Sequence, residues 1–287
     1  MIASMLRDTA AAWLWAGRAA VLVEVTEEHG SVPRGRGTRM LVGNDATLGT
    51  IGGGHLELKA IAAARDMLGR GATARREERY ALGPSLGQCC GGAVTIALAP
   101  LDAASLAGWP ASAPLFHLQL HGAGHVGRAI ASLLATLDCR VDWFDERDEE
   151  FPKTTELGSP WPSHIRVASN ATIENEVLGA PPGAFYLVLT HEHALDQRIT
   201  EAILRRGDFA FCGLIGSKTK RAKFIRRFEE RGVPASAIER MTCPIGIAGI
   251  EGKVPEIIAA AVVAQLLQTA ATPRRATSAP LGSAAAD

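Results

Sequence analysis

The sequence predicts an α/β protein in which an N-terminal mixed α+β domain with a mainly antiparallel sheet precedes a Rossmann-like domain with a doubly wound parallel sheet. Short β-branched runs separated by glycine turns fill the first hundred residues, and from residue 115 apolar strands alternate with helices. A G-x-G-x-x-G triplet opens this second part. With 287 residues, 47% of them hydrophobic, the chain has enough apolar surface for two ordinary cores.

The first domain, residues 1–100, begins with an amphipathic helix over 3–17 whose apolar residues recur at i, i+3 and i+4. A second helix is expected from His55 to Leu68. The strands are expected in "AVLVEVTEE", "TRMLVG", "ATLGTIGG", "TARREERYAL" and "GAVTIALAP". Consecutive strands joined by tight turns predict a small, mainly antiparallel sheet with helices packed on one face.

A change of pattern marks the domain boundary. Residues 101–114, "LDAASLAGWPASAP", are rich in Ala, Ser, Gly and Pro without a clear period, and this composition predicts a linker. Residues 115–270 form the predicted Rossmann-like domain, and we expect the tail, residues 271–287, to be disordered. The apolar helix "PEIIAAAVVAQLL" either fills the core of that domain or meets a second copy, and we favour the core, with a homodimer formed through other surfaces.

Charge and cysteine usage limit the partners and the compartment. Thirty basic residues balance thirty acidic ones, so the chain has no global field to hold a polyanion and we expect no nucleic-acid partner. Its first twenty residues lack a signal-peptide pattern and an uninterrupted apolar run, so we expect neither export nor membrane insertion. Five scattered cysteines make a disulfide framework improbable and favour the cytoplasm.

The glycine triplet Gly122, Gly124 and Gly127, with His125 inside it, stands between a predicted strand and a predicted helix. Such glycines allow a tight turn and close approach of a pyrophosphate. Asp145 ends the next strand about twenty residues on, where a carboxylate would accept from a ribose hydroxyl, although the nearby Arg147 weakens the distinction between NAD and its 2′-phosphate. The alternative is that the glycines only close a strand-to-helix joint.

Two later strand ends carry polar side chains. His191, His193 and Asp196 follow an apolar strand, and they form either a zinc or iron site or, as we favour, a hydrogen-bonding wall of a cofactor pocket. Ser217, with Lys218 and Lys220, follows another strand. That stretch is either a phosphate clamp or an ordinary solvated helix start.

Two glycine-rich stretches of the first domain combine flexible backbone with basic groups. "EEHGSVPRGRGTRM" carries Arg34, Arg36 and Arg39, and "GTIGGGHLE" carries Gly52, Gly53 and Gly54 directly before the helix at His55. Arginines and exposed amides bind phosphate, so we expect an anion or cofactor site here, against the alternative of two hairpin turns.

The stretch "GQCCGG" places Gln88, Cys89 and Cys90 among glycines at the mouth of the first sheet. Neighbouring cysteines rarely bridge each other, because the short link strains the disulfide geometry. The pair therefore indicates ligand or sulfur chemistry, for which a thiolate needs exposure and a positive neighbourhood. The alternative is that both cysteines act as small apolar residues.

Seven ordered blocks of this sequence closely resemble the xanthine dehydrogenase accessory protein family, XdhC, over about residues 1–268. The blocks are "GSVPRGRGTRMLV", "GTIGGGHLE", "GQCCGG", "HGAGHVGRA", "LTHEHALD", "GLIGSKTKRAKF" and "CPIGIAGIEGKVPEIIAAAVVAQL". Related molybdenum-hydroxylase accessory proteins tend to carry cysteine in place of His55 and a single cysteine in the third block, so the resemblance is to the xanthine dehydrogenase branch.

The resemblance implies a chaperone that holds the molybdenum cofactor, a molybdopterin, in its sulfurated form and passes it to the large subunit of xanthine dehydrogenase, with sulfur from a cysteine desulfurase. It suggests that Cys89 or Cys90 contacts the molybdenum or relays its sulfur. Arg34, Arg36 and the run Gly52–Gly54 would hold the pterin phosphate.

Two other functions remain open at this point. One is an NAD-dependent oxidoreductase that uses Asp145 for the ribose and His191 or His193 as general acid. It would not need the cysteine block or the arginine-rich loop of the first domain. The other is a protein-interaction adaptor that binds neither NAD nor the molybdenum cofactor.

Overall fold

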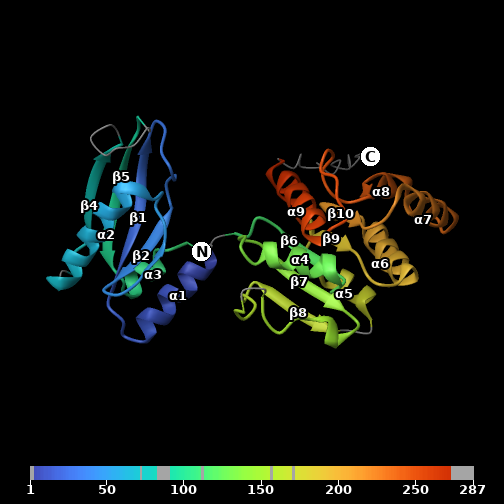
Figure 1. Ribbon diagram of the computed structural model, residues 1–287, viewed down its shortest axis with the longest axis horizontal. Helices are drawn as coiled ribbons and strands as arrows, with labels where there is room; N and C mark the ends of the chain where they lie inside the picture. Colours follow the sequence, from blue (N-terminus) through green and yellow to red (C-terminus); the bar gives the residue numbers. More distant parts are fainter. Residues whose placement is uncertain are drawn as a thin grey trace, which may run out of the picture. The chain divides into compact units, whose positions relative to one another are not determined.

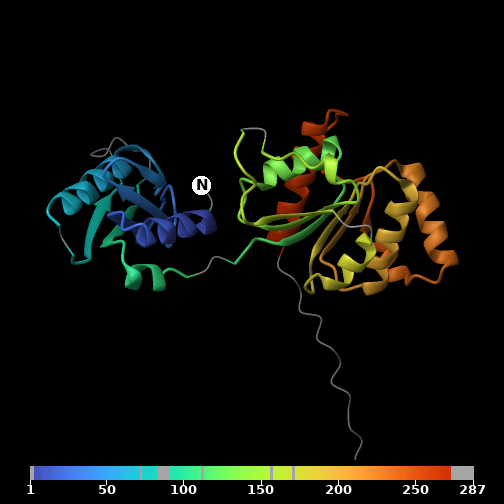
Figure 2. The same cartoon turned by 90° about the horizontal axis from the view of Figure 1, so that it is seen from below.

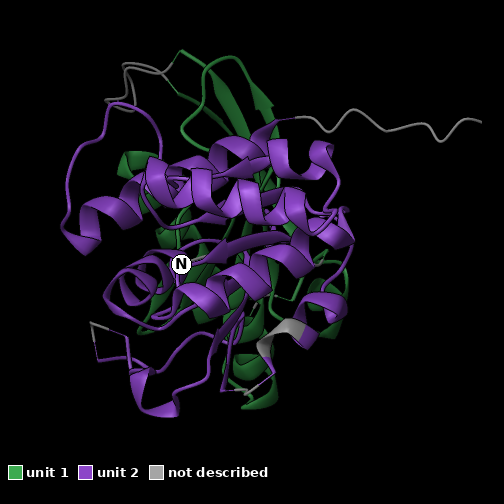
Figure 3. Cartoon of the chain, turned by 90° about the vertical axis from the view of Figure 1, so that its right-hand side faces the viewer, with its two compact units in different colours: residues 1–113 green, residues 114–287 purple. Residues whose placement is uncertain are grey.

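The computed structural model describes residues 3–71, 73–82, 91–110, 113–155, 158–169 and 172–272. The chain divides into two compact units, Met1–Ala113 and Pro114–Asp287, which Figure 3 draws in different colours. Each unit has its own sheet and its own buried clusters. Among the residues described, no helix is both long enough and apolar enough to cross a membrane.

The first unit is built on a five-stranded sheet with the order β3-β2-β1-β5-β4. Its strands are β1 (Ala20–His29), β2 (Arg39–Gly43), β3 (Thr47–Gly49), β4 (Arg76–Ala81) and β5 (Ala93–Pro100). Every neighbouring pair is antiparallel, which confirms the predicted sheet. The long strand β1 lies at the centre, paired with β2 on one side and β5 on the other (Figure 1).

Helices cover both faces of this sheet, and the expectation of helices on one face is wrong. On one face α2 (Gly54–Gly69) packs its Leu56, Ala60 and Ala64 against alternate residues of the strands. On the other face Leu6 and Ala10 of α1 (Ala3–Trp15) pack against the intervening strand residues, whose side chains point to the opposite side of the sheet. The reason lies in β1, where residues 20–23 are apolar without alternation, so both sides must be buried.

The segment predicted as a linker contains a short helix, α3 (Ala103–Ala107). Asp102 and Ser105 form a capping box that starts it, with Ser105 N donating to Asp102 Oδ1 at 2.7 Å and Asp102 N donating to Ser105 Oγ at 2.9 Å. Leu101 and Trp109 on either side are buried in the same cluster as Leu6. Residues 101–109 therefore belong to the first unit, and the expected linker has to be shortened.

The second unit is built on a six-stranded sheet with the order β11-β10-β9-β6-β7-β8. Its strands are β6 (His117–His121), β7 (Arg140–Asp145), β8 (Ile165–Ser169), β9 (Phe185–Val188), β10 (Phe211–Leu214) and β11 (Met241–Thr242). All five pairings are parallel, which confirms the Rossmann-like sheet. The strand order reverses between β6 and β9, the place where doubly wound sheets bind ligands.

Helices flank both faces of the parallel sheet, as expected for a doubly wound fold. The helices are α4 (His125–Leu134), α5 (Ile173–Gly179), α6 (His193–Arg206), α7 (Lys218–Glu230), α8 (Ala235–Glu239) and α9 (Pro255–Ala271), with a 3₁₀ turn at Asp148–Glu150. Figure 2 shows α4 and α9 on one side of the sheet and α6 and α7 on the other. The apolar helix α9 buries Ala259, Val262 and Leu266 in the same cluster as α4, so it fills the core of its own unit.

Two glycines after β6 are required by close backbone contacts. A Cβ on Gly127 would lie 2.1 Å from the carbonyl oxygen of Gly122. A Cβ on Gly122, whose φ is 125°, would lie 2.3 Å from the carbonyl oxygen of Leu189. These contacts let α4 start directly against the strand ends.

We expect Gly127→Ala to lower the free energy of unfolding by about 1 to 3 kcal/mol, because its methyl group must displace backbone. Urea unfolding of the full chain measures this. The matched control is Gly179→Ala at the end of α5, where nothing lies within 4 Å, and we expect it to be neutral or slightly stabilising. Equal effects of the two substitutions would contradict the packing described.

Candidate functional site

In the first unit, the arginine loop, residues 30–38 between β1 and β2, packs against the glycine run that precedes α2. Gly52 has a φ of 124°, and a Cβ there would lie 2.6 Å from Cβ of Pro33 and 3.6 Å from Cγ of Arg34. Only glycine permits both the backbone conformation and this contact. The structure thus brings together the two glycine-rich stretches that the sequence analysis singled out.

The same loop also contacts the start of β5. A Cβ on Gly92 would lie 2.4 Å from the carbonyl oxygen of Ser31 and 2.5 Å from that of His29. Across from it, the amide of Leu82 donates to the carbonyl oxygen of Gly92 at 2.7 Å. Gln88, Cys89 and Cys90 lie outside the described residues, but the two ends of the segment that carries them meet beside the arginine loop.

A cavity of 460 Å³ lies beside the arginine loop, and Arg34, Arg36, Arg39, Thr50 and Trp109 are among the residues that line it. Arg39 pairs with Glu24 at 2.5 Å, and its guanidinium lies 5.2 Å from the ring centre of Trp109. Arg34 and Arg36 are exposed, and within the described ranges neither guanidinium has a hydrogen bond or ion pair. Two uncompensated cations at a cavity favour an anionic ligand.

Amides of the glycine run are already hydrogen-bonded inside the turn. Glu57, in the first turn of α2, accepts from the amides of Ile51 and Gly53, both at 3.0 Å, and from the Thr50 hydroxyl. The amide of Gly52 donates to that hydroxyl at 3.1 Å. The amides of Gly52 and Gly53 are therefore already used inside the turn, and the expectation that they hold a phosphate needs correction.

Gly54 and His55, at the start of α2, are exposed beside this turn. The sequence analysis did not identify Glu57 as the residue whose carboxylate holds this turn together. An acidic residue in a first helical turn, directly after glycines, is the signal that identifies it.

The described cysteines are poor candidates for sulfur chemistry. Cys139, Cys212 and Cys243 are buried free thiols in the described part of the chain. Burial raises the pKa of the Cys139 and Cys212 thiols to about 12 and also raises the pKa of Cys243. These thiols stay protonated at neutral pH, and the thiolate is the reactive form.

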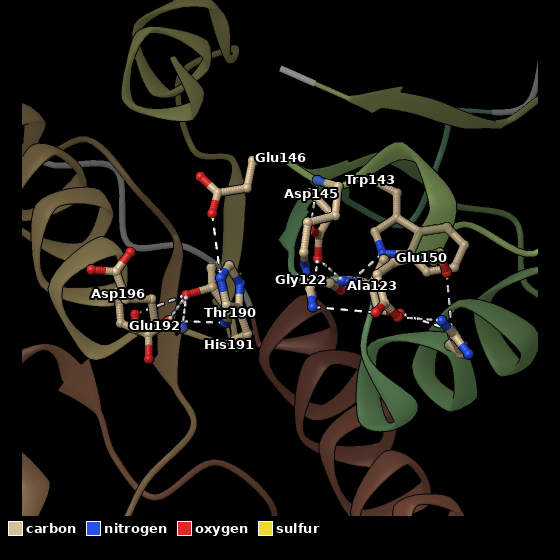
Figure 4. A network of polar contacts seen from close by, with 12 residues as sticks. Gly122, Ala123, Trp143, Asp145, Glu146, Glu150, Thr190, His191, Glu192 and Asp196 are labelled. Carbon is tan, nitrogen blue, oxygen red and sulfur yellow. Dashed lines mark hydrogen bonds and ion pairs between the residues drawn. The ribbon is translucent and has the colours of Figure 1, made fainter. Parts of the chain in front are cut away.

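In the second unit, the glycine loop after β6 is held by hydrogen bonds from β7 and α4 (Figure 4). The amide of Gly122 donates to the carbonyl oxygen of Phe144 at 2.7 Å, and the indole of Trp143 donates to that of Gly122 at 2.9 Å. Arg128 Nε donates to the carbonyl oxygen of Ala123 at 2.8 Å, and its guanidinium also pairs with Glu150. Gly124 and the exposed His125 start α4.

Asp145 is engaged with this loop and is not free to accept from a ribose. Its carboxylate is 2% exposed, accepts from the amide of Ala123 at 2.7 Å and pairs with Arg147 Nε at 3.0 Å. Arg147 Nη2 and the Arg147 amide use the remaining positions at 3.1 and 3.0 Å. Burial alone would raise the pKa of Asp145, but these hydrogen bonds together lower it.

The expectation that Asp145 binds a ribose therefore needs correction. Asp145 has the spacing from the glycine triplet that such a residue requires, but its carboxylate holds the glycine loop in place. The residues that sequence reasoning missed here are Trp143, Arg128 and Glu150. The sequence shows Arg147 two positions after Asp145, but it does not show that the Arg147 guanidinium binds both oxygens of that carboxylate.

The histidine stretch separates into two contact groups. Asp196 is 1% exposed and accepts from the Thr190 amide at 2.9 Å and from Lys220 Nζ at 2.5 Å, so it is not available to a metal. His191 Nε2 lies 3.4 Å from Glu146 Oε1, across the strand ends (Figure 4). The metal set His191, His193 and Asp196 is thus not formed.

Three exposed side chains, Glu146, His191 and Glu192, have ligand atoms within 4.8 Å of one another. His193 is exposed at the start of α6 and does not belong to that group. Ser217 caps α7 by accepting from the amide of Lys220 at 3.2 Å.

We expect Asp145→Asn to destabilise the full chain by about 3 kcal/mol, because Arg147 then lies beside a neutral group and the loop loses a charged acceptor. Chemical denaturation measures the loss. Glu146→Gln, the exposed neighbour, is the control and should change stability by less than about 0.5 kcal/mol. An Asp145→Asn variant as stable as the control would show that the carboxylate does not hold the loop.

Each of the two units matches a model of a known protein family. A model of the XdhC Rossmann domain matches residues 118–266, and a model of the XdhC and CoxI family matches residues 13–81. The uncharacterized protein YqeB of Escherichia coli K12 is 32% identical over 263 residues, which is 86% of this chain and 43% of YqeB. The chain thus spans less than half the length of that relative.

A crystal structure described as a xanthine dehydrogenase from Bacillus halodurans has the same fold. It superposes with a TM-score of 0.74 and covers 98% of each chain, at 21% sequence identity. The fold is therefore shared with that protein.

Proposed function

The chain belongs to the XdhC family, and from this membership we propose that it is a molybdenum cofactor chaperone. Family membership supports an accessory role. In our proposal the chain binds molybdopterin, holds it for sulfuration by a cysteine desulfurase and passes it to the large subunit of xanthine dehydrogenase. It would work in the cytoplasm and as a homodimer.

The observation that carries the proposal is the meeting of three segments at the arginine loop. Gly52 contacts Pro33, Gly92 contacts the backbone of residues 29 and 31, and the ends of the cysteine-bearing segment meet at Leu82 and Gly92. A chaperone for this cofactor needs phosphate-binding cations and a sulfur group close together, and these contacts bring their supporting segments to one place.

The residues present suit the phosphate end of the cargo. Arg34 and Arg36 line a cavity of 460 Å³, and their guanidinium groups have no hydrogen bond or ion pair in the described part of the chain, although the Arg36 amide donates to Glu28 Oε2 at 2.6 Å. A phosphate there would gain charge-assisted hydrogen bonds without breaking any made by these guanidinium groups. A cavity of that size lies in the range of small-molecule sites, roughly 300 to 1,000 Å³. We therefore assign phosphate binding to these arginines and not to the amides of Gly52 and Gly53.

The sulfur chemistry falls to Cys89 or Cys90 by comparison with the other thiols. The other three cysteines are buried with raised pKa values, which removes them from exchange at neutral pH. A soft thiolate is a good ligand for a thiophilic metal, and flanking glycines let a bulky ligand approach the backbone.

The oxidoreductase alternative has weaker support. Its ribose contact depends on Asp145, whose oxygens already bind Arg147 and the amide of Ala123. Parallel titrations with NAD and with the molybdenum cofactor distinguish the two functions, and an adaptor would bind neither.

The cysteine assignment predicts the metal content of purified protein. After expression in a molybdenum-replete host, we expect the double variant Cys89→Ala, Cys90→Ala to lose most of its molybdenum and of the fluorescence of its oxidised pterin. The control Cys139→Ala removes a buried thiol and should retain both. Molybdenum content unchanged in the double variant would reject a role for this pair.

The arginine assignment predicts a separate effect on affinity. We expect Arg34→Ala combined with Arg36→Ala to weaken binding of molybdopterin at least about tenfold, since two charge-assisted contacts are lost. Arg65→Ala, an exposed arginine on α2 outside the cavity, is the matched control. If fluorescence titration gives all three proteins the same dissociation constant, the phosphate does not bind at this loop.

A further inference from the structure

A second cavity, of 560 Å³, opens where β9 and β10 end and α6 and α7 begin. Thr190, His193, Ser217, Lys220, Lys223 and Arg227 contribute its polar lining. Ile215 and Phe224 contribute apolar surface. None of the residues of the glycine loop, 122–127, lines it, so this cavity differs from the crevice above β6.

The charges around the cavity do not cancel. Its one lining carboxylate, Asp196, is buried and pairs with Lys220 at 2.5 Å, and the Thr190 hydroxyl donates to the same carboxylate at 2.7 Å. Lys223 is exposed and has no hydrogen bond or ion pair among the residues that the structure covers. Arg227 donates to the amide oxygen of Gln197 at 2.6 Å, a neutral partner that leaves its charge in place.

Two positive charges, those of Lys223 and Arg227, therefore remain beside the cavity. The helices α6 and α7, which begin at the cavity, add to this positive potential. α6 has 14 residues and α7 has 13, and the cavity is lined by residues of the first turn of each, His193 and Thr219. The helix dipole places partial positive charge at each start, although in α7 the Lys220 amide already donates to Ser217 Oγ at 3.2 Å.

His191 also lines the cavity, and two further carboxylates lie beside it. Glu146 and Glu192 group around His191, and neither lines the cavity. His191 itself contacts Glu146 at 3.4 Å.

We propose that this cavity binds the phosphate group of a small phosphomonoester. Lys223 and Arg227 contact the phosphate, and Ile215 and Phe224 pack against the organic part. A dianionic phosphate matches two uncompensated cations better than a singly charged carboxylate does, and the apolar wall gives a reason for an attached organic group. The site is independent of the cofactor proposed for the first unit.

The test measures phosphate binding by isothermal titration calorimetry on the full chain carrying Arg34→Ala and Arg36→Ala. That background removes the cations of the first unit, so failure of the cofactor proposal does not affect the result. We expect one inorganic phosphate per chain, tighter binding of phenyl phosphate, and weaker binding of acetate at matched ionic strength.

In the same background, we expect Lys223→Ala and Arg227→Gln each to weaken phenyl phosphate at least about tenfold. Arg226→Gln, on the same helix but paired with Glu230 and outside the cavity, is the control for loss of one charge and should leave binding unchanged. An unchanged affinity of Lys223→Ala for phenyl phosphate in the same titration would overturn the proposal. An equal loss of affinity in Arg226→Gln would also overturn it.

Discussion

The candidate site of the first unit depends on close backbone contacts that only glycine allows. The arginine loop lies against Gly52 through Pro33 and against Gly92 through the carbonyl oxygens of His29 and Ser31. Any side chain at either glycine would push the loop away from the start of α2 or from the start of β5. The chemistry proposed here therefore requires the backbone packing first and the charged and sulfur-containing side chains second.

The same physical device recurs in the second unit, with a different result. Gly122 and Gly127 allow α4 to start against the strand ends, but the polar groups of the loop are then taken up by Trp143, Arg128 and Asp145. A glycine fingerprint thus provides close packing whether or not the loop amides remain free for a ligand. In this chain two uncompensated cations of the second unit, Lys223 and Arg227, lie at a neighbouring pair of strand ends instead.

The sequence predicts the two sheets well because side-chain periodicity and the spacing of glycine turns are local properties. The unalternated apolar run at residues 20–23 is a local sign that both faces of β1 are buried, but it does not identify the helices that cover them, because that depends on contacts between residues far apart in the sequence. Residue spacing identified the arginine and glycine stretches. Contacts between distant residues, above all those of Gly92 with the backbone of residues 29 and 31, could be found only from the fold.

Carboxylates were the main source of error in the site predictions. The sequence pattern around Glu57 suggests free glycine amides, but Glu57 accepts from the amide of Gly53, four residues away. The pattern around Asp145 suggests a free acceptor, but its carboxylate accepts from the amide of Ala123 and from Arg147. The direction in which a side chain turns is decided by burial and by competing donors, which spacing does not reveal. The same holds for Asp196, whose partner Lys220 lies on another helix.

Hydrogen exchange measured by mass spectrometry, with and without added molybdopterin, tests the central claim most directly. A cofactor seated at the arginine loop should slow exchange together in peptides covering residues 30–38, 50–54 and 91–92, while the glycine loop at 122–127 exchanges as before. Slowing confined to the second unit, with the arginine loop unaffected, would contradict the account.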